Sequence, residues 1–92
     1  MILGTFEKQP VDVKDYDIDY AQWLTEVDGI QSATVEVDPP DLTVQSVFTN
    51  PTRVKVWLMG GVPPQKYKIT VTVTTDDGRV LQHEFIVKVK DR

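Results

Sequence analysis

The chain has 92 residues, of which 40% are hydrophobic and 26% charged, with a formal net charge of −4 and no cysteine. This composition predicts one globular domain and excludes a disulfide framework, a thiolate metal site and a thiol nucleophile. The acidic balance argues against nucleic acid as a principal partner. No apolar run approaches the roughly 20 residues that a membrane helix needs, so no membrane association is expected.

The amino-terminal part of the chain alternates in polarity. Residues 1–10 are expected to form an extended arm with Phe6 as its only large anchor, and residues 11–92 a single domain. Over residues 11–20, tyrosine and isoleucine alternate with Asp15, Asp17 and Asp19, which is the period of a strand. The stretch that follows predicts a short helical turn near residues 19–25, with Asp19 as its cap.

The middle of the chain predicts three more strands, over residues 30–37, 42–48 and 53–59. Pro39 and Pro40 end the first of them, because proline cannot donate to a strand ladder. Asn50 and Pro51 indicate the next turn.

The carboxy-terminal third predicts a long hairpin. Tyr67, Ile69, Val71 and Val73 fall on one face of its first run, and lysine and threonine fall on the other. The link over residues 75–79 supplies the turn, in which Gly78 can take the positive φ that a bulged hairpin needs.

Six to seven short strands separated by turn signals predict an all-β fold, an antiparallel sandwich or barrel. Tyr67 follows a glycine- and proline-rich corner and precedes the inward Ile69 by two residues. A tyrosine there is typical of the tyrosine corner, which favours an immunoglobulin-like sandwich. The alternative is that Tyr67 is an ordinary strand aromatic.

The inward residues of the predicted strands form the predicted core, which comprises Val35, Val37, Leu42, Val44, Phe48, Val54, Val56, Leu58, Tyr67, Ile69, Val71, Val73, Phe85 and Val87.

Few residues could carry chemistry. Asp15, Asp17, Asp19 and Glu26 match carboxylate positions of a hand-type calcium loop, but Tyr20 stands where that loop needs glycine. The single histidine, His83, falls on the inward side of its strand by alternation, so it is expected to be a partly buried structural residue. Neither serine is near it in sequence. We therefore expect no catalytic residue, no metal and no cofactor.

The surface pattern favours binding to other proteins. Trp57 and Met59 are expected to point outward beside Arg53 and Lys55, although inverted parity would bury Trp57 instead. Residues 1–42 contain ten acidic and two basic residues, and residues 43–92 contain four acidic and eight basic ones. This asymmetry either pairs strands within one domain or separates an acidic side from a basic side. On the second reading, we expect an interface that joins Asp15, Asp17 and Asp19 to Arg53, Lys55, Lys66 and Lys68, with Trp57 and Met59 as its apolar part.

Several segments resemble a known family: Phe6 to Pro10, Tyr16 to Tyr20 and Trp23-Leu24 near the start, then Trp57-Leu58, Gly60-Gly61 and Tyr67 to Val71. Thr75, Gly78-Arg79 and Phe85 continue the likeness. In order and spacing they resemble the fibre–tail adaptor proteins of tailed phages and prophages. The resemblance implies a non-enzymatic, immunoglobulin-like virion protein of the tail or neck. The first residues lack a basic segment followed by a long apolar one, so no signal peptide is expected and the protein should be made in the host cytoplasm. An adaptor is expected to contact other virion proteins. The charge asymmetry predicts a head-to-tail contact between copies, which closes into a ring when the rotation permits. Because exposed ion pairs are weak, the free protein is expected to be a monomer or weak oligomer. The alternative is a carbohydrate-binding or cell-surface module of the same fold.

Overall fold

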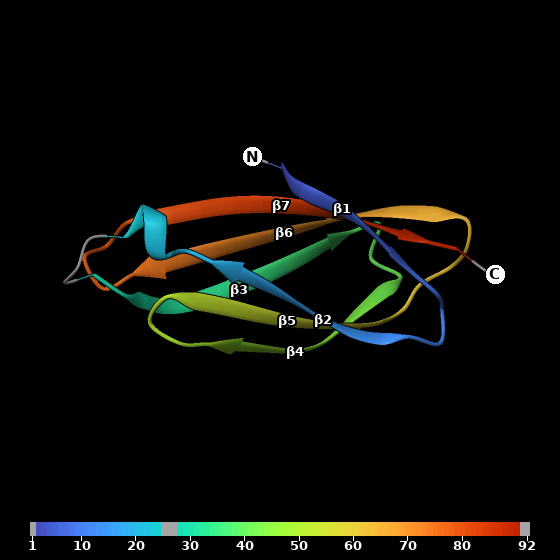
Figure 1. The fold of residues 1–92 in the computed structure, drawn as a ribbon, viewed down its shortest axis with the longest axis horizontal. Helices are drawn as coiled ribbons and strands as arrows, with labels where there is room; N and C mark the ends of the chain where they lie inside the picture. The colour runs from blue at the N-terminus through green and yellow to red at the C-terminus, as the bar shows by residue number, and fades with distance from the viewer. Residues whose placement is uncertain (1, 25–27, 91–92) are drawn as a thin grey trace.

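The structure, a computed structural model, describes residues 2–24 and 28–90. It is a two-layer β-sandwich, drawn out to 45 × 21 × 18 Å (Figure 1). The strands are β1 (Ile2–Lys8), β2 (Val13–Asp19), β3 (Ile30–Asp38), β4 (Leu42–Thr49), β5 (Arg53–Gly60), β6 (Gln65–Thr75) and β7 (Val80–Val89), with one short 3₁₀ helix, η1 (Ala21–Trp23). Within the described part of the chain, no helix is long and apolar enough to cross a membrane.

The two sheets have the strand orders β1-β7-β6-β3 and β2-β5-β4. Lettered A to G along the chain, these are AGFC and BED, which is the immunoglobulin arrangement with the first strand moved to the other sheet. All pairs are antiparallel except β1 with β7, which is parallel. Residues 2–8, expected to be an extended arm, are extended and form the edge strand β1 of the four-stranded sheet. The prediction of an all-β, immunoglobulin-like sandwich is confirmed.

The core forms where the inward rows of the two sheets meet. The inward row of β5 (Val54, Val56 and Leu58) and that of β6 (Tyr67, Ile69, Val71 and Val73) have no exposed surface. Leu42, Phe85 and Val87 are also buried, and Val35, Val37 and Val44 pack against this core while partly buried. The buried hydrophobic set also includes four residues that were not in the predicted core: Ile18, Tyr20, Ile30 and Val89.

The prediction that Phe48 belongs to the core is wrong, because its side chain is 60% exposed. A bulge between Val44 and Ser46 shifts the β4–β5 register by one residue. Beyond it, Val47 lies opposite the buried Val56 and Phe48 lies opposite the outward Lys55. Since one extra residue in a strand exchanges its two faces, simple alternation assigns Phe48 to the wrong side.

The tyrosine corner is present. The Val62 N–H, in the corner between β5 and β6, donates to Tyr67 Oη at 2.8 Å. Burial raises the pKa of the Tyr67 hydroxyl, while the bond from Val62 opposes that rise. The buried tyrosine therefore anchors the main chain of the corner to the start of β6.

The turns follow the sequence with small adjustments. Gly78 has φ of 87°, and the Thr75 carbonyl accepts from the Gly78 N–H, as expected for the bulged hairpin. The predicted helical turn is η1, and the Ala21 N–H donates to Asp19 Oδ1 at 2.9 Å. The N-cap position itself is Tyr20, one residue later than predicted.

Two phenylalanines test the register. Phe85→Ala should lower the free energy of unfolding by roughly 3–5 kcal/mol, because it removes a buried ring and leaves a cavity. Phe48→Ala, a matched change on the exposed side, should stay within about 0.5 kcal/mol of the parent. Denaturant melts measure both, and equal costs would contradict the bulged register of β4.

Two of the chain's three tyrosines give a matched test of the corner. Tyr67→Phe should cost about 1–3 kcal/mol, because the Val62 N–H loses its acceptor. Tyr16→Phe should cost nothing or stabilise the fold, since Tyr16 Oη is buried and has no hydrogen-bond partner among the described residues. Urea melts of the two variants should therefore differ in sign or clearly in size. A Tyr67→Phe variant as stable as Tyr16→Phe would show that the corner bond contributes nothing.

Candidate interaction surface

The solvent-facing side of the three-stranded sheet, here named the β2-β5-β4 face, gathers most of the predicted interface residues. Strand β2 contributes Asp15, Asp17 and Asp19, and the central strand β5 contributes Arg53, Lys55, Trp57 and Met59. Strand β4 adds Thr43, Ser46 and Phe48. In Figure 1 these strands form the layer opposite β6 and β7. The parity of β5 is as predicted, with valine and leucine inward and Trp57 outward.

Ion pairs connect the acidic and basic members of this face. Lys55 Nζ lies 3.6 Å from Asp15 Oδ2, and Arg53 Nη2 lies 3.6 Å from Asp19 Oδ2. All four side chains are about half exposed, so each pair contributes only about 0–1 kcal/mol. Asp17 forms no ion pair with any residue in the described ranges. Part of the charge asymmetry thus joins neighbouring strands within one molecule.

Apolar side chains interrupt this charged face. Phe48 and Met59 are exposed, and Trp57 is half-buried between Asp15 and Ser46. At the start of β2, Val13 lies opposite Met59 and is 47% exposed. Aromatic residues, methionine and arginine are enriched in protein–protein interfaces, so this composition suits contact with another protein.

Lys66 and Lys68 lie elsewhere. They point outward from β6, on the opposite face of the sandwich, where Lys68 Nζ contacts Glu84 Oε2 at 3.2 Å. Lys66 lies opposite Lys88 of β7 and pairs with no acid in the part of the chain that the structure describes. The basic residues of the predicted interface are therefore divided between two faces that point in opposite directions.

The calcium-loop alternative does not suit the geometry. Asp15, Asp17 and Asp19 are spaced along a straight edge strand, whereas calcium needs oxygen ligands that converge. Among residues 2–24 and 28–90, no cluster of acidic or histidine side chains could hold a metal ion. Glu26 lies outside the described residues.

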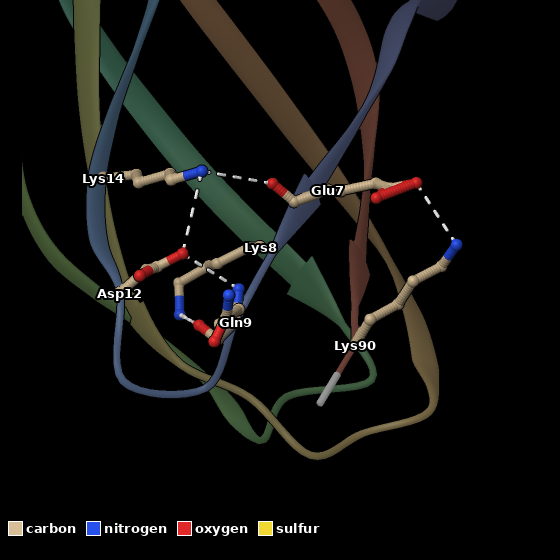
Figure 2. A pocket seen from close by; sticks show the side chains of 6 residues that line it. All are labelled: Glu7, Lys8, Gln9, Asp12, Lys14 and Lys90. Atoms are coloured by element: carbon tan, nitrogen blue, oxygen red, sulfur yellow. Dashed lines mark hydrogen bonds and ion pairs between the residues drawn. The ribbon is translucent and has the colours of Figure 1, made fainter. Parts of the chain in front are cut away.

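A polar pocket of about 280 Å³ lies at the β1–β2 turn (Figure 2). Its floor includes Lys8, which is only 2% exposed and donates from Nζ to the carbonyls of Gln9, at 2.9 Å, and Gly60, at 2.6 Å. Burial lowers the pKa of Lys8, and the nearby Asp12 partly opposes this. The sequence does not single out Lys8, since nothing local distinguishes it from an exposed lysine. Its two carbonyl contacts tie β1 to the end of β5, which is a structural role.

His83 is more deeply buried than predicted. It is 6% exposed, and its ring lies 4.5 Å from that of Trp23 and 5.1 Å from that of Tyr20. Nδ1 has no hydrogen-bond partner within the described chain. Burial lowers the pKa of His83 and raises that of Tyr20 to about 12. This group is a packed aromatic cluster, and Ser32 and Ser46 lie on the outward sides of their strands, away from it.

Comparison of the chain with known protein families gives a match. Residues 8–88 match the model of a family described as podophage GP4 fiber-tail adaptor protein gp77. The matched range contains β2 to β6 in full, and with them the whole β2-β5-β4 face. No curated protein matches the chain significantly. The predicted resemblance to phage fibre–tail adaptors is confirmed.

The buried histidine makes stability depend on pH. Its pKa is near 6.5 when unfolded and lower when folded, so the fold is stabilised fully above about pH 6.5. That stabilisation is lost as pH falls through the folded value, at no more than about 1.4 kcal/mol per pH unit. Chemical denaturation from pH 7 to 5.5 should show the decline, and His83→Gln should remove it. Parallel profiles for the two proteins would mean that His83 does not control this range.

Proposed function

The chain belongs to the podophage GP4 fibre–tail adaptor family, and we propose that it acts as a non-enzymatic adaptor through protein–protein contacts. Family membership gives it a structural adaptor role in the phage tail, as a component of the virion. The mode of action is our proposal, and the observation that carries it is the mixed apolar and charged β2-β5-β4 face.

Two features of the chain support a role without chemistry. The single histidine is enclosed by aromatic rings, so it has no access to a substrate. The buried Lys8 is engaged by two carbonyl oxygens, which leaves it poorly placed as a nucleophile. An exposed face with aromatic, methionine and arginine side chains suits binding better than catalysis.

We further propose that neighbouring copies meet head to tail. The β2-β5-β4 face of one copy presents Asp17, and the opposite face of the next presents Lys66; both side chains lack an ion pair within the described chain. Because the two faces point in opposite directions, repeated contacts of this kind generate rings when the rotation closes. Exposed charge pairs contribute little and are screened by salt. The free protein is therefore expected to be a monomer or weak oligomer that associates when the virion holds copies close together.

A charge exchange tests this contact. Asp17→Lys and Lys66→Glu should each weaken self-association at high protein concentration, because each places like charges across the contact. Combining the two substitutions should restore it. Asp77→Lys, at the exposed hairpin tip, is the matched control. It changes the net charge by the same amount as Asp17→Lys but should leave association unchanged. Sedimentation equilibrium in low and high salt measures these effects.

Failure of the double variant to recover would exclude the Asp17–Lys66 contact. Association that persists in high salt would point to the apolar residues Phe48, Trp57 and Met59 instead.

The adaptor role is tested separately: mass spectrometry of purified virions should detect the chain, and particles made without it should lack attached fibres. Fully fibred, infectious particles without the chain would contradict the role itself.

A further inference from the structure

The edge of the three-stranded sheet has a vacant position. In constant-type immunoglobulin sandwiches the first strand pairs with the second, giving an ABED sheet. Here β1 pairs with β7 instead, so β2 has β5 as its only strand neighbour in the described chain. The strands β1 and β2 meet at the turn over residues 9–12 and continue in different layers (Figure 1).

The main chain of β2 offers hydrogen bonds at this edge. The Tyr20 N–H donates to the Thr52 carbonyl at 2.7 Å, which continues the β2–β5 register beyond the strand. Bonded and non-bonded pairs alternate along an antiparallel ladder, so the even-numbered residues of β2 bond to β5. The N–H and C=O groups of Asp15 and Asp17 therefore point to the free edge, where a further strand could pair with them.

An apolar hollow lies directly beside this edge. It measures about 280 Å³ and is lined by Phe6 of β1, Phe85 of β7, and Asp15, Tyr16, Asp17 and Ile18 of β2. The three aromatic rings pack together, with centroids 5.3–5.9 Å apart. Phe6 is still 44% exposed, so the rim of the hollow is an uncovered part of the core. A strand added to β2 would direct alternate side chains into it.

The other side chains of such a strand would lie beside an acidic row. Residues directly opposite each other in a strand pair share a face, with Cβ atoms about 4.5–5.5 Å apart. Positions opposite Asp15 and Asp17 would thus point outward next to carboxylates, and Asp17 has no other ion-pair partner in the described chain. Lysine or arginine suits these positions, and acidic residues would be repelled.

The edge strands of a second copy do not provide this pattern. Pairing β2 with its own copy would set the aspartate rows against each other. The outward residues of β4 are Thr43, Ser46 and Phe48, and those of β3 include Glu36 and Asp38. The remaining edge strand, β1, has one basic residue, Lys8, which is buried. The occupant therefore comes from a different protein.

We propose that the free edge of β2 binds an extended segment of another virion protein, with basic residues alternating with apolar ones. The segment adds a fourth strand to the sheet, its apolar side chains filling the hollow at Phe6 and Phe85. This inference rests on the adaptor role for the identity of the partner, but the edge itself can be tested in isolation.

The probe is a nine-residue synthetic peptide that alternates arginine with valine or leucine, titrated into the ¹⁵N-labelled full chain. Saturable shifts and slowed amide exchange are expected at Asp15 and Asp17, with binding that weakens as salt increases. Asp17→Asn should weaken binding by up to about fivefold, the effect of one exposed ion pair. Glu36→Gln, on the edge strand of the other sheet, is the matched control and should bind normally. A peptide with glutamate in place of arginine should not bind.

Asp17→Pro provides a second variant. Proline is tolerated on an edge strand where its N–H faces solvent, so the fold should persist while the edge loses a donor and peptide binding fails. If that variant unfolds, the exchange protection at Asp15 and Asp17 in the parent decides the question. Peptide shifts centred on β4, no saturable binding, or equal binding of the glutamate peptide would each overturn the inference. Absence of the chain from virions, with peptide binding intact, would contradict the adaptor role alone.

Discussion

The sandwich depends on the contact between the inward rows of β5 and β6. Valine and leucine at alternate positions of β5 face tyrosine, isoleucine and valine at alternate positions of β6, and all seven side chains are fully buried. Because strand side chains alternate strictly, burying Val56 and Leu58 forces Trp57 and Met59 to the other side. The proposed interaction face is therefore a consequence of core packing. Any change that slips the β5 register would lose the core and the face together.

Two buried charged side chains lie at opposite ends of the sandwich, where loops supply their hydrogen-bond partners. At one end Lys8 donates to two carbonyls, and at the other Asp28 accepts from the N–H groups of Gly29 and Asp77. Burial alone would raise the pKa of Asp28, but these bonds and the Thr75 hydroxyl bring it below its ordinary value. These polar contacts fix how the loops close at each end of the sandwich.

The sequence predicted the parts of the fold that local rules control. Alternation located the strands, the glycine at position 78 located the hairpin turn, and the spacing of Tyr67 located the corner. Phe48 was misassigned because a β-bulge depends on how two strands meet, which one strand does not reveal. Lys8 was missed for a similar reason, since its carbonyl partner at Gly60 is 52 residues away. Seven predicted interface residues share one face (Asp15, Asp17, Asp19, Arg53, Lys55, Trp57 and Met59), whereas Lys66 and Lys68 lie on the opposite face. Alternation in the sequence fixes which side of its strand a residue takes, but not which sheet the strand joins.

In the proposed head-to-tail arrangement, binding depends on many repeated contacts. Each contact available to the isolated chain is small, because the charges are exposed and the apolar side chains are scattered among them. In the proposed ring, each further contact would be intramolecular, so a high effective concentration would compensate for the low affinity of a single contact. The proposed strand addition at the free edge of β2 would contribute affinity in a different way. Main-chain hydrogen bonds need no particular side chain, and the alternating side chains of the added strand would supply the specificity. Leaving β1 in the opposite sheet keeps that edge open. An arrangement with β1 paired to β2 would cover the hydrogen-bonding groups of β2, and this edge could then not receive a partner strand.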